Sequence, residues 1–163
     1  MAVKGSRSDQ RMGARAVAGK RASLRAIGDE DLAAIDTWYG EAAKAAYESR
    51  SSRETFAGDN DTLLAIVRPN DDQPIGLLEY ETANGWVTVP FIALAKAYRG
   101  WGYGSEAVRL LEEWTVREGI ADRFRAEVDV RNGLGLYFWL RLGYRPLGAA
   151  EEGRVLAMVR EAG

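Results

Sequence analysis

The chain has 163 residues, of which 47% are hydrophobic and 28% are charged, a composition typical of one globular domain with a substantial core. It contains no cysteine and no histidine, which excludes disulfides, thiolate metal sites, a cysteine nucleophile and a Ser-His-Asp triad. The net charge is −2, but residues 1–25 hold seven basic side chains against one acidic one. The rest of the chain is therefore acidic, which either favours a cationic substrate over nucleic acid or only aids solubility.

We expect residues 1–20 to be a flexible basic tail, because they are rich in Gly, Ser, Ala and Arg, and residues 21–163 to form a single domain. No apolar run reaches the roughly 18 residues that a membrane span needs. The tail also lacks the apolar core of a secretory signal. A cytoplasmic protein without a membrane partner is therefore expected, and a short Arg-rich transit peptide stays open as an alternative.

The first half of the chain predicts a sheet interrupted by helices. Acidic residues 29–31 suit a helix start, because they oppose the helix dipole, and Gly40 is expected to end that helix. Asn84-Gly85 predicts a hairpin turn, and Pro90 predicts a bulge or the departure of a strand from its neighbour. The remaining expected elements are a strand at 22–27, a second helix at 41–50, a loop at 49–61 that borders a substrate entrance, a turn at 69–74, and strands at 62–67, 75–81 and 86–94.

The second half predicts a helix at 105–118 that is closed by Gly119, because its apolar residues recur at helical spacing. Residues 123–130 alternate between apolar and charged side chains, as a half-buried strand does. The apolar residues of these two elements are Ala107, Leu110, Leu111 and Trp114 in the helix, and Phe124, Ala126, Val128 and Val130 in the strand. A short helix at 135–142 and strands at 144–147 and 155–159 complete a mixed α/β sheet.

Residues 92–105 combine the end of an apolar strand, a loop with glycine at 100, 102 and 104, and the start of a helix. The first N–H groups of a helix have no intrahelical partner and lie at the positive end of its dipole. Glycines let the main chain turn tightly and approach a phosphate closely. Arg99 adds a planar, permanently charged donor. The stretch therefore predicts a site for a pyrophosphate.

Two segments resemble the GNAT superfamily of N-acetyltransferases. The first is Tyr98-Arg99-Gly100-Trp101-Gly102-Tyr103-Gly104-Ser105, which is similar to the family's acetyl-CoA loop. The second is Asn132, followed by Phe138-Trp139 and by Leu142-Gly143-Tyr144-Arg145 at the family's spacing. The resemblance covers about residues 21–160. A dinucleotide-binding fingerprint needs one more residue before its last glycine, and a Walker loop needs Gly-Lys-Ser/Thr, so both alternatives fit less well.

The resemblance implies an acyl-CoA N-acyltransferase fold with a mostly antiparallel sheet, flanking helices, and two strands, 86–94 and 123–130, that splay apart to admit acetyl-CoA. It also implies transfer of the acetyl group to a primary amine by direct attack, with a backbone N–H near Leu94 polarising the thioester carbonyl. Asn132 is expected to contact the pantetheine arm, to cap the following helix, or to do both. The residues expected to contact acetyl-CoA are Ile92, Ala93, Leu94, Arg99, Gly100, Trp101, Gly102, Tyr103, Gly104, Ser105, Asn132 and Trp139.

The catalytic groups are less clearly indicated than the acetyl-CoA loop. The position of the family's general-acid tyrosine holds Trp139, whose indole N–H cannot protonate a thiolate, so Tyr137 and solvent remain the candidates. Glu79, with Glu81 on the same strand face, is a candidate general base, and solvated surface carboxylates are the alternative reading. A binding module that keeps the coenzyme site without turnover also remains open. The acceptor, a small molecule or a peptide, and the oligomeric state, a homodimer included, are not readable, and no metal is expected.

Overall fold

The computed structural model describes residues 17–57 and 61–162. Its strands form one eight-stranded sheet in the order β1-β2-β3-β4-β5-β6-β8-β7, and β5 with β6 is the one parallel pair among these neighbours. The strands are β1 Val17–Ala18, β2 Ser23–Ala26, β3 Leu63–Val67, β4 Pro74–Ala83, β5 Trp86–Leu94, β6 Arg123–Asp129, β7 Arg145–Pro146 and β8 Val155–Glu161, and the helices are η1 Asp29–Asp31, α2 Leu32–Asp36, α3 Tyr39–Ala45, α4 Ser52–Thr55, η2 Lys96–Tyr98, α5 Tyr103–Arg117 and α6 Gly133–Arg141. This confirms the predicted mixed, mostly antiparallel α/β fold.

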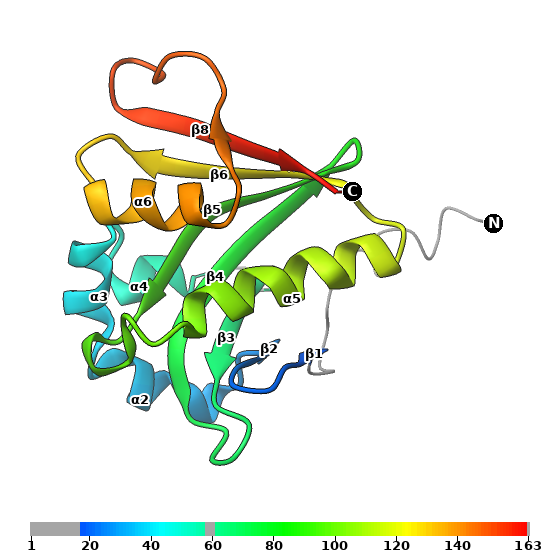
Figure 1. Cartoon of the computed structure of the whole chain (residues 1–163). Coiled ribbons are helices and arrows are strands. Elements are labelled where there is room, and N and C mark those ends of the chain that lie inside the picture. The colour runs from blue at the N-terminus through cyan, green and yellow to red at the C-terminus, as the bar shows by residue number, and fades with distance from the viewer. Residues whose placement is uncertain (1–16, 58–60, 163) are drawn as a thin grey trace.

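The sheet has a core on each face, with α5 and α6 on one side and α2 and α3 on the other (Figure 1). The larger core joins α5 and α6 to the sheet through side chains such as Tyr80, Leu111 and Phe124. The apolar stripe predicted for α5 is confirmed, since all four of its residues are buried. Among the described residues, no helix is long and apolar enough to cross a membrane.

The β4–β5 hairpin turns at Asn84 and Gly85, which have φ values of 53° and 83°, as the sequence predicted. Pro90 lies at a bulge in β5, because Glu79 and Glu81 on β4 pair with Phe91 and Thr88, three residues apart. Because of this extra residue, side chains of the same parity lie on opposite faces of the sheet before and after the bulge. Side chains 87 and 89 belong to the core under α5, whereas 91 and 93 belong to the core under α3.

Two boundaries in the N-terminal third differ from the sequence prediction. Strand β1 pairs with β2 through Val17 and Ala18, so the sheet begins inside the segment predicted as a tail, whereas residues 1–16 lie outside the described residues. Gly40 does not end a helix but lies within α3. The break comes earlier, where the Thr37 hydroxyl donates to the Ala34 carbonyl over 2.6 Å and competes with the helical pattern.

One helix and one strand also end earlier than the sequence predicted. Helix α3 stops at Ala45 instead of residue 50, because Tyr47 adopts a φ of 60°. Strand β6 stops at Asp129, and Val130 is 39% exposed instead of facing the core. The expected loop at 49–61 contains α4, whose start is a capping box. The capping-box pattern Ser51-Ser52-Arg53-Glu54 in the sequence is the signal that marks this helix.

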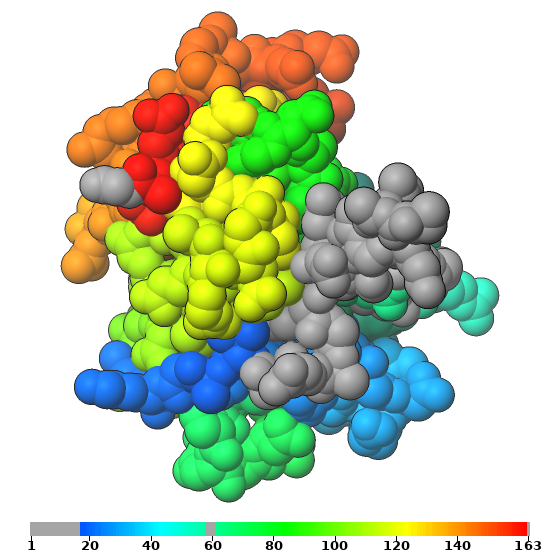
Figure 2. Space-filling view, turned by 90° about the vertical axis from the view of Figure 1, so that its right-hand side faces the viewer, coloured from blue at the N-terminus to red at the C-terminus, as the bar shows by residue number. Residues whose placement is uncertain are grey.

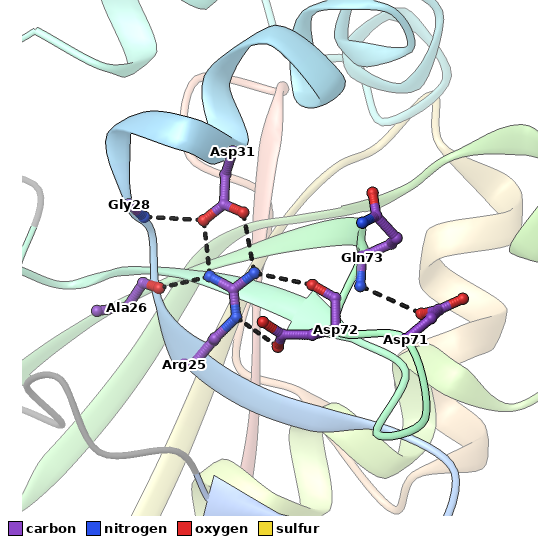
Figure 3. A network of polar contacts seen from close by, with 7 residues as sticks. All are labelled: Arg25, Ala26, Gly28, Asp31, Asp71, Asp72 and Gln73. Carbon is purple, nitrogen blue, oxygen red and sulfur yellow. Dashed lines mark hydrogen bonds and ion pairs between the residues drawn. The ribbon is translucent and has the colours of Figure 1, made fainter.

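Arg25 on β2 holds the turn before β4 against the first helical segment (Figure 3). Its guanidinium donates to the Asp31 carboxylate over 2.6 and 2.9 Å and to the Asp72 carboxylate over 2.8 Å. The carboxylate of Asp31, which is buried, also accepts from the Gly28 N–H over 2.8 Å. The Arg25 hydrogen bonds lower the pKa of Asp31, and the Gly28 N–H adds to this effect against the cost of burial.

We expect Asp31→Asn to destabilise the fold by about 1–3 kcal/mol at neutral pH, because it removes a charged acceptor of a partly buried guanidinium. Since the folded-state pKa of Asp31 lies below its unfolded value, this contribution is present above pH ~4 and is lost as the pH falls through the folded pKa. Urea unfolding of both proteins at pH 7 and at pH 3 measures it. A difference that persists undiminished at pH 3 would contradict this account.

Candidate active site

Strands β5 and β6 part at Pro90. Their parallel pairing runs from Trp86 with Arg123 to Val89 with Ala126 and goes no further. Beyond that point β5 stays paired with β4, and β6 stays paired with β8. The sheet therefore opens between two neighbouring strands, and the opening lies at the end of β5 that leads into the glycine loop.

The open edge of β5 carries the backbone groups of Ile92 and Leu94. The Ala95 N–H donates to the Ile75 carbonyl of β4 over 2.8 Å. Because backbone groups alternate between the two sides of a strand, those of Leu94 and Ile92 face away from β4 and toward the opening. Ala93 was predicted to contact acetyl-CoA, but by the same alternation its backbone faces β4 and its side chain is buried under α3.

The glycine loop ends in a helix start whose N–H groups are free of intrahelical partners. Gly100 and Gly102 have φ values of 82° and 91°, which lie in the left-handed region. The first helical hydrogen bond of α5 runs from the Glu106 N–H to the Gly102 carbonyl over 3.1 Å. The preceding N–H groups, those of Tyr103 to Ser105, therefore have no carbonyl one turn earlier and form a candidate anion site.

Gly104 lets α5 start in close contact with β5 and α6. A Cβ added there would lie 3.2 Å from the Leu94 side chain and 3.3 Å from the ring of Phe138. Phe138 thus lies beside the anion site. The sequence singled it out as part of a motif but not as a site residue, because its neighbour Trp139 occupied the position of interest.

Arg99 is bound to the protein itself. Its Nε donates to the Leu94 carbonyl over 2.9 Å, and its guanidinium also pairs with Glu41 on α3. These contacts fix the loop to the end of β5 and leave only part of the guanidinium for a phosphate. Next to it, Trp101 is 64% exposed on the outside of the loop, where its ring is accessible to a ligand.

Asn132 caps α6, since its side-chain oxygen accepts the Gly135 N–H over 2.9 Å, and its amide N–H groups remain for a ligand.

Trp139, in contrast, is 3% exposed, and its ring centroid lies 4.7 Å from that of Tyr144. It is part of the core, so its contact with acetyl-CoA, expected from the sequence, stays a prediction that this burial does not favour. Tyr137 is 59% exposed on α6 beneath Arg141, with 5.7 Å from the guanidinium carbon to the ring centroid.

Glu79 lies opposite Phe91, the first residue beyond the bulge, on the face covered by α3. Arg50 donates to its carboxylate over 2.8 Å and to that of Glu48 over 2.9 Å. Burial alone raises the pKa of Glu48, but the hydrogen bonds from Arg50 outweigh it, so the pKa lies below its usual value. Glu81, two residues along β4, is exposed.

A family model described as the acetyltransferase (GNAT) family matches residues 32–144, which is more than half of the chain. The chain belongs to the GNAT acetyltransferase family. It is therefore an acetyl-CoA-dependent N-acyltransferase.

Solved structures share the fold of this acetyltransferase at low sequence identity. A GNAT-family acetyltransferase from Bacillus anthracis matches at 12% identity and a TM-score of 0.77, over 90% of this chain and 98% of that one. An acetyltransferase from Salmonella typhimurium that modifies the N-terminal serine of ribosomal protein L7/L12 matches at 16% and 0.77, over 91% and 100%. An N-acetyltransferase from Thermoplasma acidophilum, solved with coenzyme A, matches at 19% and 0.69, over 86% and 98%. No curated protein matches.

A pocket of about 440 Å³ opens in the acetyltransferase beside Arg50. It borders α3 and the start of α4, so the segment predicted to border a substrate entrance does line a cavity. Its lining includes Asp36, Tyr39, Lys44, Glu48, Arg50 and Ser51. Within residues 17–57 and 61–162, no group of three carboxylate, histidine or cysteine side chains could hold a metal ion.

A buried ion network, which the sequence did not reveal, joins α6 and β8 to α5. The Glu112 carboxylate accepts from the Tyr144 hydroxyl over 2.5 Å, from Arg160 over 2.7 Å and from Arg109 over 2.9 Å. Arg109 also donates to the Leu142 carbonyl at the end of α6 over 2.9 Å. Burial, and then the charge of Glu112, raises the pKa of Tyr144, so its hydroxyl remains a donor. The network positions α6, and with it Phe138, against α5.

Proposed function

We propose that this acetyltransferase moves the acetyl group of acetyl-CoA to a primary amine, which attacks the thioester carbonyl directly. The observation that carries the proposal is the open edge of β5, where the backbone groups of Ile92 and Leu94 face the gap left by β6. A pantetheine arm resembles a short peptide, and this edge offers it the hydrogen bonds of a missing strand.

The coenzyme's diphosphate is assigned to the N–H groups at the start of α5, and its thioester to the Leu94 N–H. The Leu94 carbonyl already accepts from Arg99, which holds this peptide segment in place. A fixed donor at the thioester oxygen stabilises the charge that develops when the amine attacks. The C–N bond forms, the C–S bond breaks, and coenzyme A leaves as a thiolate.

Water is the proposed proton donor for that thiolate. Trp139, at the family's tyrosine position, is buried in the core, and the described ring contact of Tyr137 is with Arg141. A thiolate is a stable leaving group near neutral pH because the pKa of a thiol is about 8.5. We therefore propose that Tyr137, the candidate acid in the sequence, is dispensable.

Glu79 is the proposed general base, acting through water on the acceptor ammonium. Its pairing with Arg50 and its position opposite Phe91 place it on the α3 face, at the level where β5 leaves β6. We expect Glu79→Gln to lower the acetylation rate most at low pH, where little of the acceptor amine is unprotonated. The measurement is the pH–rate profile of kcat/KM.

Glu81→Gln is the matched control, since it removes the same charge from the same strand at an exposed position. Its profile is expected to equal that of the wild type. A Glu79→Gln profile that keeps the wild-type shape would exclude Glu79 as the base and leave its ion pair with Arg50 a purely structural contact.

The acceptor is proposed to enter beside Arg50, from the side of α3 and α4. The carboxylates of Asp36 and Glu48, which line the pocket together with Lys44 and Arg50, can accept hydrogen bonds from an acceptor ammonium. The test is a panel of acceptor amines, which includes small amines and, because the Salmonella relative modifies a protein N-terminus, peptides. Because the chain has no cysteine, released coenzyme A can be measured with a thiol reagent without background from the protein.

Thiol measurement across the panel of acceptor amines separates the two functions left open by the sequence, an active acetyltransferase and a coenzyme-binding module without turnover. Thiol release that depends on one acceptor class supports the enzyme and identifies its substrate class. Coenzyme binding in a thermal-shift assay, with no release above hydrolysis across the panel, would instead favour the binding module, to which the buried Trp139 gives specific support. Cytoplasmic location, a homodimer and the absence of a nucleic-acid partner stay predictions.

A further inference from the structure

We propose that Arg21, carried by the turn between β1 and β2, is a ligand of the coenzyme's diphosphate. The cation expected to serve there from the sequence was Arg99, which opens the glycine loop. In the structure Arg99 donates to the Leu94 carbonyl and pairs with the Glu41 carboxylate, so its charge is already partly neutralised within the protein. The anion site therefore requires another cation if a doubly charged diphosphate is to be neutralised.

Arg21 lies on the glycine loop, although 80 residues separate it from Trp101. Its guanidinium donates to the Trp101 carbonyl and lies 5.5 Å from the ring centroid of Tyr103, the first residue of α5. A Cβ built on Gly102 would approach the Arg21 Nη1 to 3.0 Å. The guanidinium is thus adjacent to the N–H groups that form the anion site.

The backbone of Arg21 is anchored independently of its side chain. The N–H groups of Arg21 and Ala22 both donate to one carboxylate oxygen of Glu106, over 2.8 and 3.1 Å. Glu106 belongs to the first turn of α5, and a Cβ on Gly19 would collide with the same oxygen, at 2.3 Å. In Figure 2 the N-terminal segment, in blue, lies against the light green of α5.

Glu106 lies in the first turn of α5, and these backbone contacts reduce the repulsion that its carboxylate would exert on a phosphate. One oxygen of Glu106 is occupied by two backbone donors, which offset its charge. The Arg21 side chain takes no part in these backbone contacts and is exposed. Among the described residues it makes one hydrogen bond, to a neutral carbonyl, and a guanidinium has five N–H donors. The remaining donors can bind two phosphate oxygens in the bidentate manner typical of arginine.

The test is calorimetric titration of the full chain with coenzyme A and with 3′-dephospho-coenzyme A. We expect Arg21→Ala to raise the Kd of both by roughly tenfold or more, the effect of losing a charge-assisted hydrogen bond, and Arg21→Lys to recover part of the loss. Arg117→Ala is the matched control, because it removes an exposed arginine at the far end of the same helix, and its Kd values are expected to be those of the wild type.

Three outcomes overturn the proposal. An unchanged Kd in folded Arg21→Ala and Arg21→Lys, with a lower Tm of the free protein, would make Arg21 a purely structural latch of the N-terminal segment. A loss confined to coenzyme A would assign Arg21 to the ribose 3′-phosphate and not to the diphosphate. An equal loss in Arg117→Ala would reduce the effect to net charge. If the wild type itself gives no heat of binding with coenzyme A, the coenzyme site as a whole is refuted, and this result is distinguishable from a failure of the Arg21 proposal.

Discussion

Replacing Gly102 by valine is expected to weaken coenzyme A binding by at least about 100-fold and to abolish acetyl transfer at ordinary substrate concentrations. Gly102 has a φ of 91° and directly precedes α5. A β-branched residue is strongly strained in this left-handed conformation, and its side chain would also occupy the space beside Arg21. The loop must then change shape, and the N–H groups at the start of α5 lose their common direction. Calorimetry with coenzyme A measures the effect.

Gly119→Val separates loop geometry from general strain. Gly119 follows the other end of α5, has a φ of 71°, and nothing lies within 4 Å of an added Cβ. It should lower the thermal stability through the same kind of backbone strain while leaving the Kd unchanged. If the Gly102 and Gly119 variants lose stability alike and bind coenzyme A equally well, the glycine loop is not the diphosphate site.

Replacing Glu112 by leucine is expected to have the largest effect on stability, a loss of about 3–5 kcal/mol. The substitution removes the buried common acceptor of the Tyr144 hydroxyl, which is also buried, and of the partly exposed Arg109 and Arg160. Against a total stability of about 5–15 kcal/mol, this corresponds to a decrease in Tm of roughly 10 °C for a chain of this size. Denaturant unfolding followed by circular dichroism measures the loss.

Glu113→Leu is the matched control, since its carboxylate is one residue away and exposed on α5, and a change within about 0.5 kcal/mol is expected. Glu112→Gln should fall between the two, because an amide oxygen still accepts hydrogen bonds without carrying the charge. A loss below about 1 kcal/mol in Glu112→Leu would show that the network does not stabilise the fold.

Much of the fold was predictable because it depends on local patterns. The alternation in β6, the apolar stripe of α5 and the Asn84-Gly85 turn each follow from the backbone preferences and burial of a few neighbouring residues. The bulge at Pro90 was predictable for the same reason, since proline cannot donate in a sheet ladder. The errors, such as the positions of Gly40 and Val130, lie at element ends, where a side-chain contact or a positive φ decides between continuing and turning.

The candidate site was predictable in its backbone but less so in its side chains. The parting of β5 from β6 is confirmed. The assignment of the coenzyme to the glycine loop stays a prediction, which rests on the order of the glycines and the strand and helix that flank them. The roles of Arg99 and Trp139 could not be settled in the same way. Whether a guanidinium binds a ligand or its own protein, and whether an indole faces a channel or the core, depends on neighbours far away in the chain.

By itself, then, the order of residues indicated an acetyltransferase of mixed α/β fold and predicted an anion site between residues 99 and 105, because glycine spacing and hydrophobic period act over a few residues. Only the tertiary structure decided which charges meet there. It brought Arg21 to Trp101 and Glu106, and Glu112 to Tyr144 and Arg160. Hydrogen bonds and ion pairs act over a few ångströms of space, and no sequence spacing specifies the partners that folding brings together.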